Sequence, residues 1–152
     1  MTELRKYQEQ FERMKRCYSQ FQTIDLGIRH DRNTDYYQDI VYAFFINCYH
    51  LKDWIISDKT VKLKNKEREV ENFIYDNKCM NTCENICNGI KHLNLKKSKL
   101  KGRKHELKIG DSKGTIYSAK YNIVSLGVNK DAFELASECV KKWEEFIKKN
   151  IN

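Results

Sequence analysis

The chain has 152 residues, of which 40% are hydrophobic and 33% are charged, and its formal net charge is +8. This length and composition are typical of one folded globular domain with a single hydrophobic core. No stretch approaches the roughly 20 apolar residues that a membrane-spanning helix needs, and no apolar segment follows residues 1–6 as a secretory signal requires. We therefore expect a single domain over residues 1–152, without a membrane segment and located in the cytoplasm.

Apolar residues recur at steps of three and four along most of the chain, which is the spacing of one helical face. In the first segment this stripe consists of Leu4, Tyr7, Phe11, Met14, Tyr18 and Phe21. Helices are expected over residues 2–22, 34–57, 66–77, 78–93 and 129–150. The second has the widest apolar face and should be central, the third and fourth could be continuous, and Asn129 or Asp131 can cap the last.

Residues 94–128 interrupt the helical pattern. Two extended runs, residues 107–109 and 115–126, flank a turn rich in Gly, Asp and Ser, which predicts a β-hairpin. The expected fold class is therefore mainly α, a bundle of four to five helices with a β-hairpin inserted before the C-terminal helix. The helical core would comprise residues 2–93 and 129–150, with a basic segment and the hairpin between them.

The positive charge is concentrated in residues 91–108, which we call the basic segment. It holds eight basic residues and one acidic residue, so it carries a net charge of +7 out of the chain's +8. The basic residues are Lys91, Lys96, Lys97, Lys99, Lys101, Arg103, Lys104 and Lys108. Cations at this density bind phosphates and release counterions, so we expect nucleic acid, RNA or DNA, or an acidic protein as the partner. A solvated loop without a partner is the alternative.

A first polar cluster lies on the expected central helix. His50 and Asp53 are three residues apart and can share one helical face. A carboxylate beside an imidazole fixes its tautomer and raises its basicity. The alternative is an ordinary polar contact at the edge of the core.

A second polar cluster ends the fourth helix, where Asn88 and His92 are four residues apart and border the basic segment. An imidazole beside phosphate-binding lysines can act as an acid or base in RNA cleavage, in which the 2′-hydroxyl is the nucleophile, and Asn88 could orient the phosphate. Helix capping by both residues is the alternative.

Three of the six cysteines, Cys79, Cys83 and Cys87, follow one another at steps of four, which places them on one face of a helix. Zinc sites usually contain C-x2-C knuckles, and this spacing differs from them. Without an export signal a disulfide framework is not expected. We therefore expect buried free thiols that pack as small apolar groups, with no metal and no cofactor.

Two further features could serve in binding. Tyr117 and Tyr121, on the expected hairpin, are candidates for stacking on nucleic-acid bases. The apolar stripe of the first helix suits either packing inside the bundle or the seam of a homodimer.

The chain resembles small helical proteins of bacteria and their mobile elements. The resemblance rests on the motifs YHLKDW and NGIKH, on a hairpin and on a terminal helix with tryptophan. More distantly, the helical core with a polar residue before His92 is similar to HEPN domains, many of which are RNases of toxin–antitoxin and phage-defence systems. The HEPN signature is an Arg followed after four to six residues by a His. Here Asn85 precedes His92 with six residues between, and Asn88 with three, so an Asn stands in place of the Arg.

These features together predict a nucleic-acid or polyanion-binding module of a phage-defence, toxin–antitoxin or mobile-element system. One alternative is a HEPN-like, metal-independent RNase that uses His92 with Asn88 or Asn85. Another is a protein-interaction module, an inhibitor or adaptor, that acts through the first helix or the hairpin.

Overall fold

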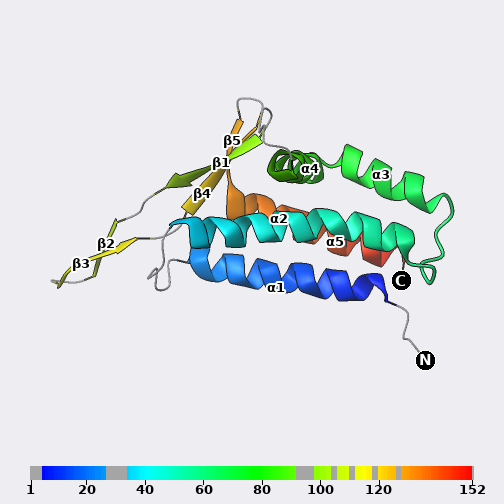
Figure 1. The fold of residues 1–152 in the computed structure, drawn as a ribbon, viewed down its shortest axis with the longest axis horizontal. Coiled ribbons are helices and arrows are strands. Elements are labelled where there is room, and N and C mark those ends of the chain that lie inside the picture. The colour runs from blue at the N-terminus through cyan, green and yellow to red at the C-terminus, as the bar shows by residue number, and fades with distance from the viewer. Residues whose placement is uncertain are drawn as a thin grey trace.

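The computed structural model describes residues 5–26, 34–91, 98–103, 106–109, 112–117, 120–125 and 128–151. Its helices are α1 (Tyr7–Asp25), α2 (Thr34–Ser57), α3 (Lys66–Asp76), α4 (Lys78–Lys91) and α5 (Ala132–Asn150). Its strands are β1 (Ser98–Arg103), β2 (Glu106–Ile109), β3 (Ser112–Tyr117), β4 (Lys120–Ser125) and β5 (Val128–Asp131). The expected fold class is confirmed, because the chain is mainly helical and an antiparallel hairpin precedes the C-terminal helix (Figure 1).

Three long helices, α1, α2 and α5, lie side by side along the long axis of the molecule, and α4 crosses α2 and α5 (Figure 1). As expected, α2 is central, since it contacts each of the other four helices. The apolar stripe of α1 is part of the same core, where Tyr7, Met14 and Phe21 are buried, so this stripe packs within the chain. In the described ranges, no helix is both long enough and apolar enough to cross a lipid bilayer.

Several helix boundaries differ from the expected ones because of local polar contacts. α1 begins at Tyr7 rather than at residue 2. α3 and α4 are separate, because Asn77 is extended (φ −110°, ψ 114°) and its side chain donates to the carbonyl of Phe73 at 2.8 Å. α5 begins at Ala132, where the carboxylate of Asp131 accepts a hydrogen bond from the backbone N of Glu134 at 2.9 Å. The three residues before it belong to a strand rather than to the expected helix.

The strands form two sheets instead of one hairpin. β2 and β3 make the expected antiparallel hairpin, which extends away from the helices (Figure 1). β1, β4 and β5 form a second antiparallel sheet with β4 in the centre. The run of residues 115–126, expected as one strand, is thus divided between β3 and β4.

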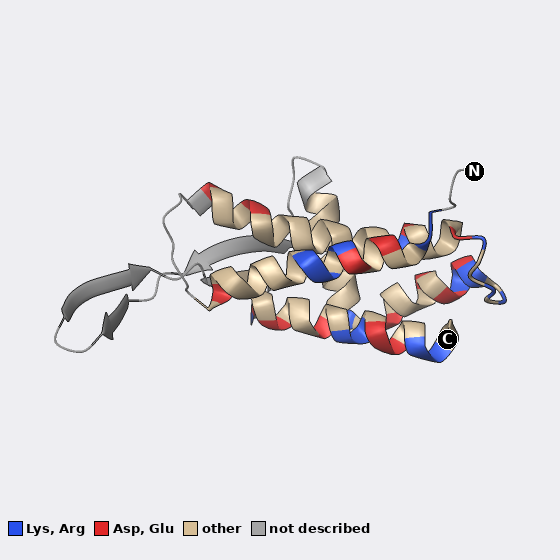
Figure 2. Cartoon of the chain, turned by 90° about the horizontal axis from the view of Figure 1, so that it is seen from below, with Lys and Arg blue, Asp and Glu red and all other residues tan. Residues whose placement is uncertain are grey.

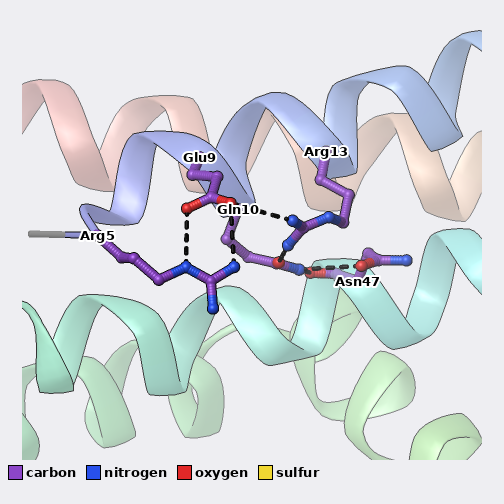
Figure 3. Close-up of polar contacts among 5 residues, drawn as sticks. All are labelled: Arg5, Glu9, Gln10, Arg13 and Asn47. Carbon is purple, nitrogen blue, oxygen red and sulfur yellow. Dashed lines mark hydrogen bonds and ion pairs between the residues drawn. The ribbon is translucent and has the colours of Figure 1, made fainter. Parts of the chain in front are cut away.

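A buried amide joins α1 to α2. Gln10 Nε2 donates to the backbone oxygen of Asn47 at 2.9 Å and to its Oδ1 at 3.1 Å, and Gln10 Oε1 accepts from Arg13 (Figure 3). Glu9 pairs with Arg5 at 3.0 Å and with Arg13 at 3.4 Å. The ion pairs are solvent-exposed and contribute little to stability, whereas the buried amide fixes how the two helices are aligned because each of its polar atoms has a partner.

A buried carboxylate follows the end of α2. Asp58 is 5% exposed, and its carboxylate accepts hydrogen bonds from the backbone N of Tyr7 at 2.8 Å and from the backbone N and Oγ1 of Thr60 at 2.8 and 2.7 Å. Burial raises the pKa of the Asp58 carboxyl, but the hydrogen bonds from Thr60 and Tyr7 outweigh burial and hold this pKa below its ordinary value. Asp58 therefore ties the start of α1 to the connector between α2 and α3.

Replacing this carboxylate should destabilise the fold. Asp58→Asn should lower the free energy of unfolding at pH 7 by about 1 to 3 kcal/mol, because charged hydrogen bonds to buried groups are lost. The lowered pKa means that the contribution of Asp58 is complete above about pH 4, the pKa of an unfolded aspartate, and is lost as pH falls through the folded-state value. The stability of the variant should therefore depend less on pH in acid. Urea titrations from pH 7 to pH 3 measure both effects.

The matched control is Asp53→Asn, which removes an exposed carboxylate from the last turns of α2. Its effect should stay within about 0.5 kcal/mol. Equal losses for the two variants would contradict the role given to Asp58.

Candidate functional site

The strand register gathers basic residues on one face of the three-stranded sheet. Lys99, Lys101 and Arg103 occupy alternate positions of β1, so they belong to the same face. Arg103 is paired with Lys120 of β4, which adds a fourth basic position. We call these four residues the basic sheet face. Three of them belong to the basic segment, and Lys120 lies outside it.

The opposite face of this sheet is covered by helices. Tyr121 and Ile123 of β4 are buried, and Asn122 between them is only half-buried. Lys130 of β5 is paired with Ile123, and its Nζ lies 2.6 Å from the carboxylate of Glu138 on α5. The basic sheet face is therefore the side of the sheet turned away from α5.

The rest of the basic segment is described only in part. Lys91 is the last residue of α4, and Lys108 lies in β2. Lys96, Lys97 and Lys104 lie outside the described residues, so the expectation for them stays a prediction.

His50 and Asp53 are both exposed on α2, and among the described residues no hydrogen bond or ion pair joins them. Lys52, which lies between them in sequence, makes the polar contacts instead. Its Nζ is 3.3 Å from the hydroxyl of Tyr49 and 3.3 Å from the carboxylate of Glu71 on α3. Burial lowers the pKa of Lys52, but these two partners raise it above its ordinary value. Lys52 thus joins α2 to α3, a role that the sequence pattern did not predict.

The predicted catalytic residues are brought together only in part. Asn88 is exposed on the last turns of α4, and Asn85 is half-buried one turn earlier. His92 lies outside the described residues. The assignment of an RNase site to these three residues therefore stays a prediction.

The prediction that Tyr121 stacks on bases is wrong, because its ring is only 4% exposed and lies on the helix-covered face of the sheet. Burial, followed by the neighbouring Tyr37 and Tyr42 and by Asp35, raises the pKa of Tyr121 to about 12. The alternation of buried and half-buried residues along β4 separates Tyr121 from the basic sheet face. For Tyr117, the structure describes only its position in β3, so base stacking by this residue stays a prediction.

A group of thiols lies in the centre of the helical core. The sulfur atoms of Cys48 on α2, Cys83 on α4 and Cys139 on α5 all lie within 4.8 Å of one another, and all three residues are fully buried. We call these three residues the thiol cluster. The expectation of buried free thiols holds for Cys79, Cys83 and Cys87. The meeting of Cys83 with two distant cysteines was not foreseen.

The thiols around this cluster bond to helix backbones. The thiols of Cys83 and Cys87 donate to the carbonyl of Phe45 at 3.4 and 3.1 Å, and that of Cys139 donates to the carbonyl of Cys79 at 3.4 Å. Burial raises the pKa of the Cys83 thiol, because the charged thiolate is disfavoured away from water. Two of the three sulfur atoms of the cluster, those of Cys83 and Cys139, are therefore held by backbone carbonyls of α2 and α4.

A groove with a volume of about 840 Å³ runs between α4, α5 and the three-stranded sheet. Cys79 and Asn85 of α4 line it, together with Ile123 of the sheet and Glu138 of α5. Part of its wall is apolar, and it reaches the edge of the core at Cys79.

No protein-family model, no curated protein and no solved structure matches this chain. The resemblance to HEPN domains and to mobile-element proteins therefore stays a prediction.

The burial of Tyr121 generates a test that separates packing from base stacking. Tyr121→Ala should lower the free energy of unfolding by about 3 kcal/mol, because a buried aromatic ring is removed from between sheet and helices. Thermal and urea unfolding measure the loss. The control is Tyr75→Ala, whose ring is 79% exposed and whose removal should change stability by less than about 0.5 kcal/mol. A stable Tyr121→Ala protein would show that this ring is not part of the core.

Proposed function

We propose that this chain binds nucleic acid, and that the basic sheet face contacts the phosphate backbone. The observation that carries the proposal is the register of β1 with β4, which gives four basic positions on one face of the sheet with Arg103 and Lys120 directly paired. The predicted functions as a ribonuclease and as a protein-interaction module have no comparable support among the described residues.

The spacing of these positions suits an extended row of phosphates. Alternate residues of a strand are about 6.7 Å apart, so Lys99, Lys101 and Arg103 form a row of cationic positions along β1. Neighbouring phosphates of an extended single strand have a similar separation. Contacts of this kind position a nucleic acid without reading its sequence.

The distribution of charge over the rest of the chain favours this face as the binding surface. Outside the basic segment the charges nearly cancel, and on the described helices acidic and basic residues are interspersed (Figure 2). Asn129 of β5, paired with Val124, is exposed on the same side of the sheet as the basic residues. Asp131 also belongs to this side, but its carboxylate is engaged at the start of α5.

The proposal is tested by removing three charges from the basic sheet face. The triple variant Lys99→Gln, Lys101→Gln and Arg103→Gln should bind single-stranded RNA and DNA at least about tenfold more weakly. The slope of log affinity against log salt should become shallower by about two to three, since each lost phosphate contact removes about 0.7 to 0.9. Fluorescence anisotropy with labelled oligonucleotides at several salt concentrations measures both quantities.

The matched control is the triple variant Lys59→Gln, Lys62→Gln and Lys64→Gln. These lysines are exposed in the connector between α2 and α3, at the end of the bundle opposite the sheets (Figure 1). Both triple variants lower the net charge by the same amount, so a difference between them reports position and not total charge. Equal weakening by the two variants, or no binding by the unmodified protein, would disprove the proposal.

A further inference from the structure

Three helices place the sulfur atoms of Cys48, Cys83 and Cys139 within 4.8 Å of one another in the middle of the core. We propose that this thiol cluster binds a soft d10 metal ion, Zn²⁺ or Cu⁺, through its three thiolates. The site is separate from the basic sheet face, and the proposal does not depend on nucleic-acid binding.

The distances suit metal coordination after a small adjustment. Metal–sulfur bonds are about 2.3 Å long, so sulfur atoms that share one ion lie about 3.8 to 4.0 Å apart. The sulfur atoms of the thiol cluster need to approach one another by at most about 1 Å. Rotation of the cysteine side chains can supply this change without a shift of the helices.

The chemistry of the donors selects the class of metal. All three ligands are thiols, and soft thiolate donors favour Cu⁺ and Zn²⁺ over Mg²⁺ or Ca²⁺, which bind through oxygen. Each thiol that becomes a ligand releases its proton, so one ion bound by three thiolates displaces up to three protons.

Two further cysteines lie one helical turn on either side of Cys83. The backbone carbonyl of Cys79 accepts a hydrogen bond from the Cys139 thiol at 3.4 Å, and the Cys87 thiol shares the carbonyl of Phe45 with the Cys83 thiol. Structural Zn²⁺ sites are tetrahedral and need a fourth ligand, which either of these thiols can supply, whereas Cu⁺ is satisfied by three thiolates. The need for a fourth cysteine therefore distinguishes the two ions.

The groove between α4, α5 and the three-stranded sheet lies next to the thiol cluster. Cys79 lines this groove, and its backbone carbonyl accepts a hydrogen bond from the Cys139 thiol of the cluster at 3.4 Å. The groove thus meets the cluster at the contact between Cys79 and Cys139.

The competing explanation is that the thiols only fill space, since free cysteine packs as a small apolar side chain. Titration of the reduced, metal-free protein decides between the two. We expect one Zn²⁺ or one Cu⁺ per chain by competition with a chromophoric chelator, and sulfur-to-metal charge-transfer bands with Co²⁺ as a spectroscopic probe. Release of protons should accompany binding. The absence of stoichiometric binding by the unmodified protein would overturn the proposal, whatever the variants do.

The variants identify the ligands. Cys48→Ala and Cys139→Ala should each weaken binding at least about 100-fold, since the loss of a group that only orients a ligand already costs about 10- to 100-fold. Cys17→Ala, which removes the half-buried cysteine of α1 outside the cluster, should leave binding unchanged. Loss of Zn²⁺ binding in Cys79→Ala or Cys87→Ala, with Cu⁺ binding retained, supports the three-thiolate site and names the fourth zinc ligand.

Melting curves recorded without metal show which variants are folded. Equal weakening by Cys17→Ala would overturn the proposal. Stoichiometric binding retained by both Cys48→Ala and Cys139→Ala would also overturn it, as would a disulfide within the cluster whose reduction yields no metal binding.

Discussion

One turn of α2, residues 45–48, is the place on which the arrangement of the helices depends. The carbonyl of Phe45 accepts a hydrogen bond from the Cys87 thiol of α4 at 3.1 Å, and the carbonyl of Cys48 accepts one from Trp143 Nε1 of α5 at 3.0 Å. In the same turn, Gln10 of α1 donates to a backbone oxygen at 2.9 Å. A carbonyl oxygen has two lone pairs, so it can accept such a bond in addition to its helical one. Side chains of three helices therefore set their positions against a single turn of a fourth.

This arrangement brings the cysteines together. Small side chains at Cys48, Cys83 and Cys139 allow α2, α4 and α5 to approach closely at the level of that turn, and Trp143 fills the space beside them. The three-stranded sheet packs against α4 and α5 from the other side, where Ile123 meets the groove. The two candidate sites thus lie on the two sides of the same pair of helices, one inside the core and one on the surface of the sheet.

The sequence was a good guide where one periodic pattern decides the structure. The stripe of apolar residues predicted α2 from Thr34 to Ser57, as found. β1 could not be predicted, because SKLKGR has little strand propensity and owes its structure to pairing with β4. The spacing of Cys83 with its helical neighbours was visible, but Cys48 and Cys139 are 91 positions apart, and only tertiary packing brings them together. The sequence showed that the positive charge is concentrated in the basic segment. Its placement on one face of the sheet depends on the register of β1 with β4, which the sequence did not show.

The pairing of Arg103 with Lys120 has a consequence for the sheet itself. Like charges at directly opposed positions repel and weaken strand pairing. Without a bound anion, this repulsion therefore lowers the stability of the pairing at this end of the sheet. An anion bound between Arg103 and Lys120 would attract both residues and offset their repulsion. Binding of the anion and pairing of β1 with β4 at this end would therefore stabilise each other. Selection for the most stable sheet would have placed an acidic residue at one of these two positions.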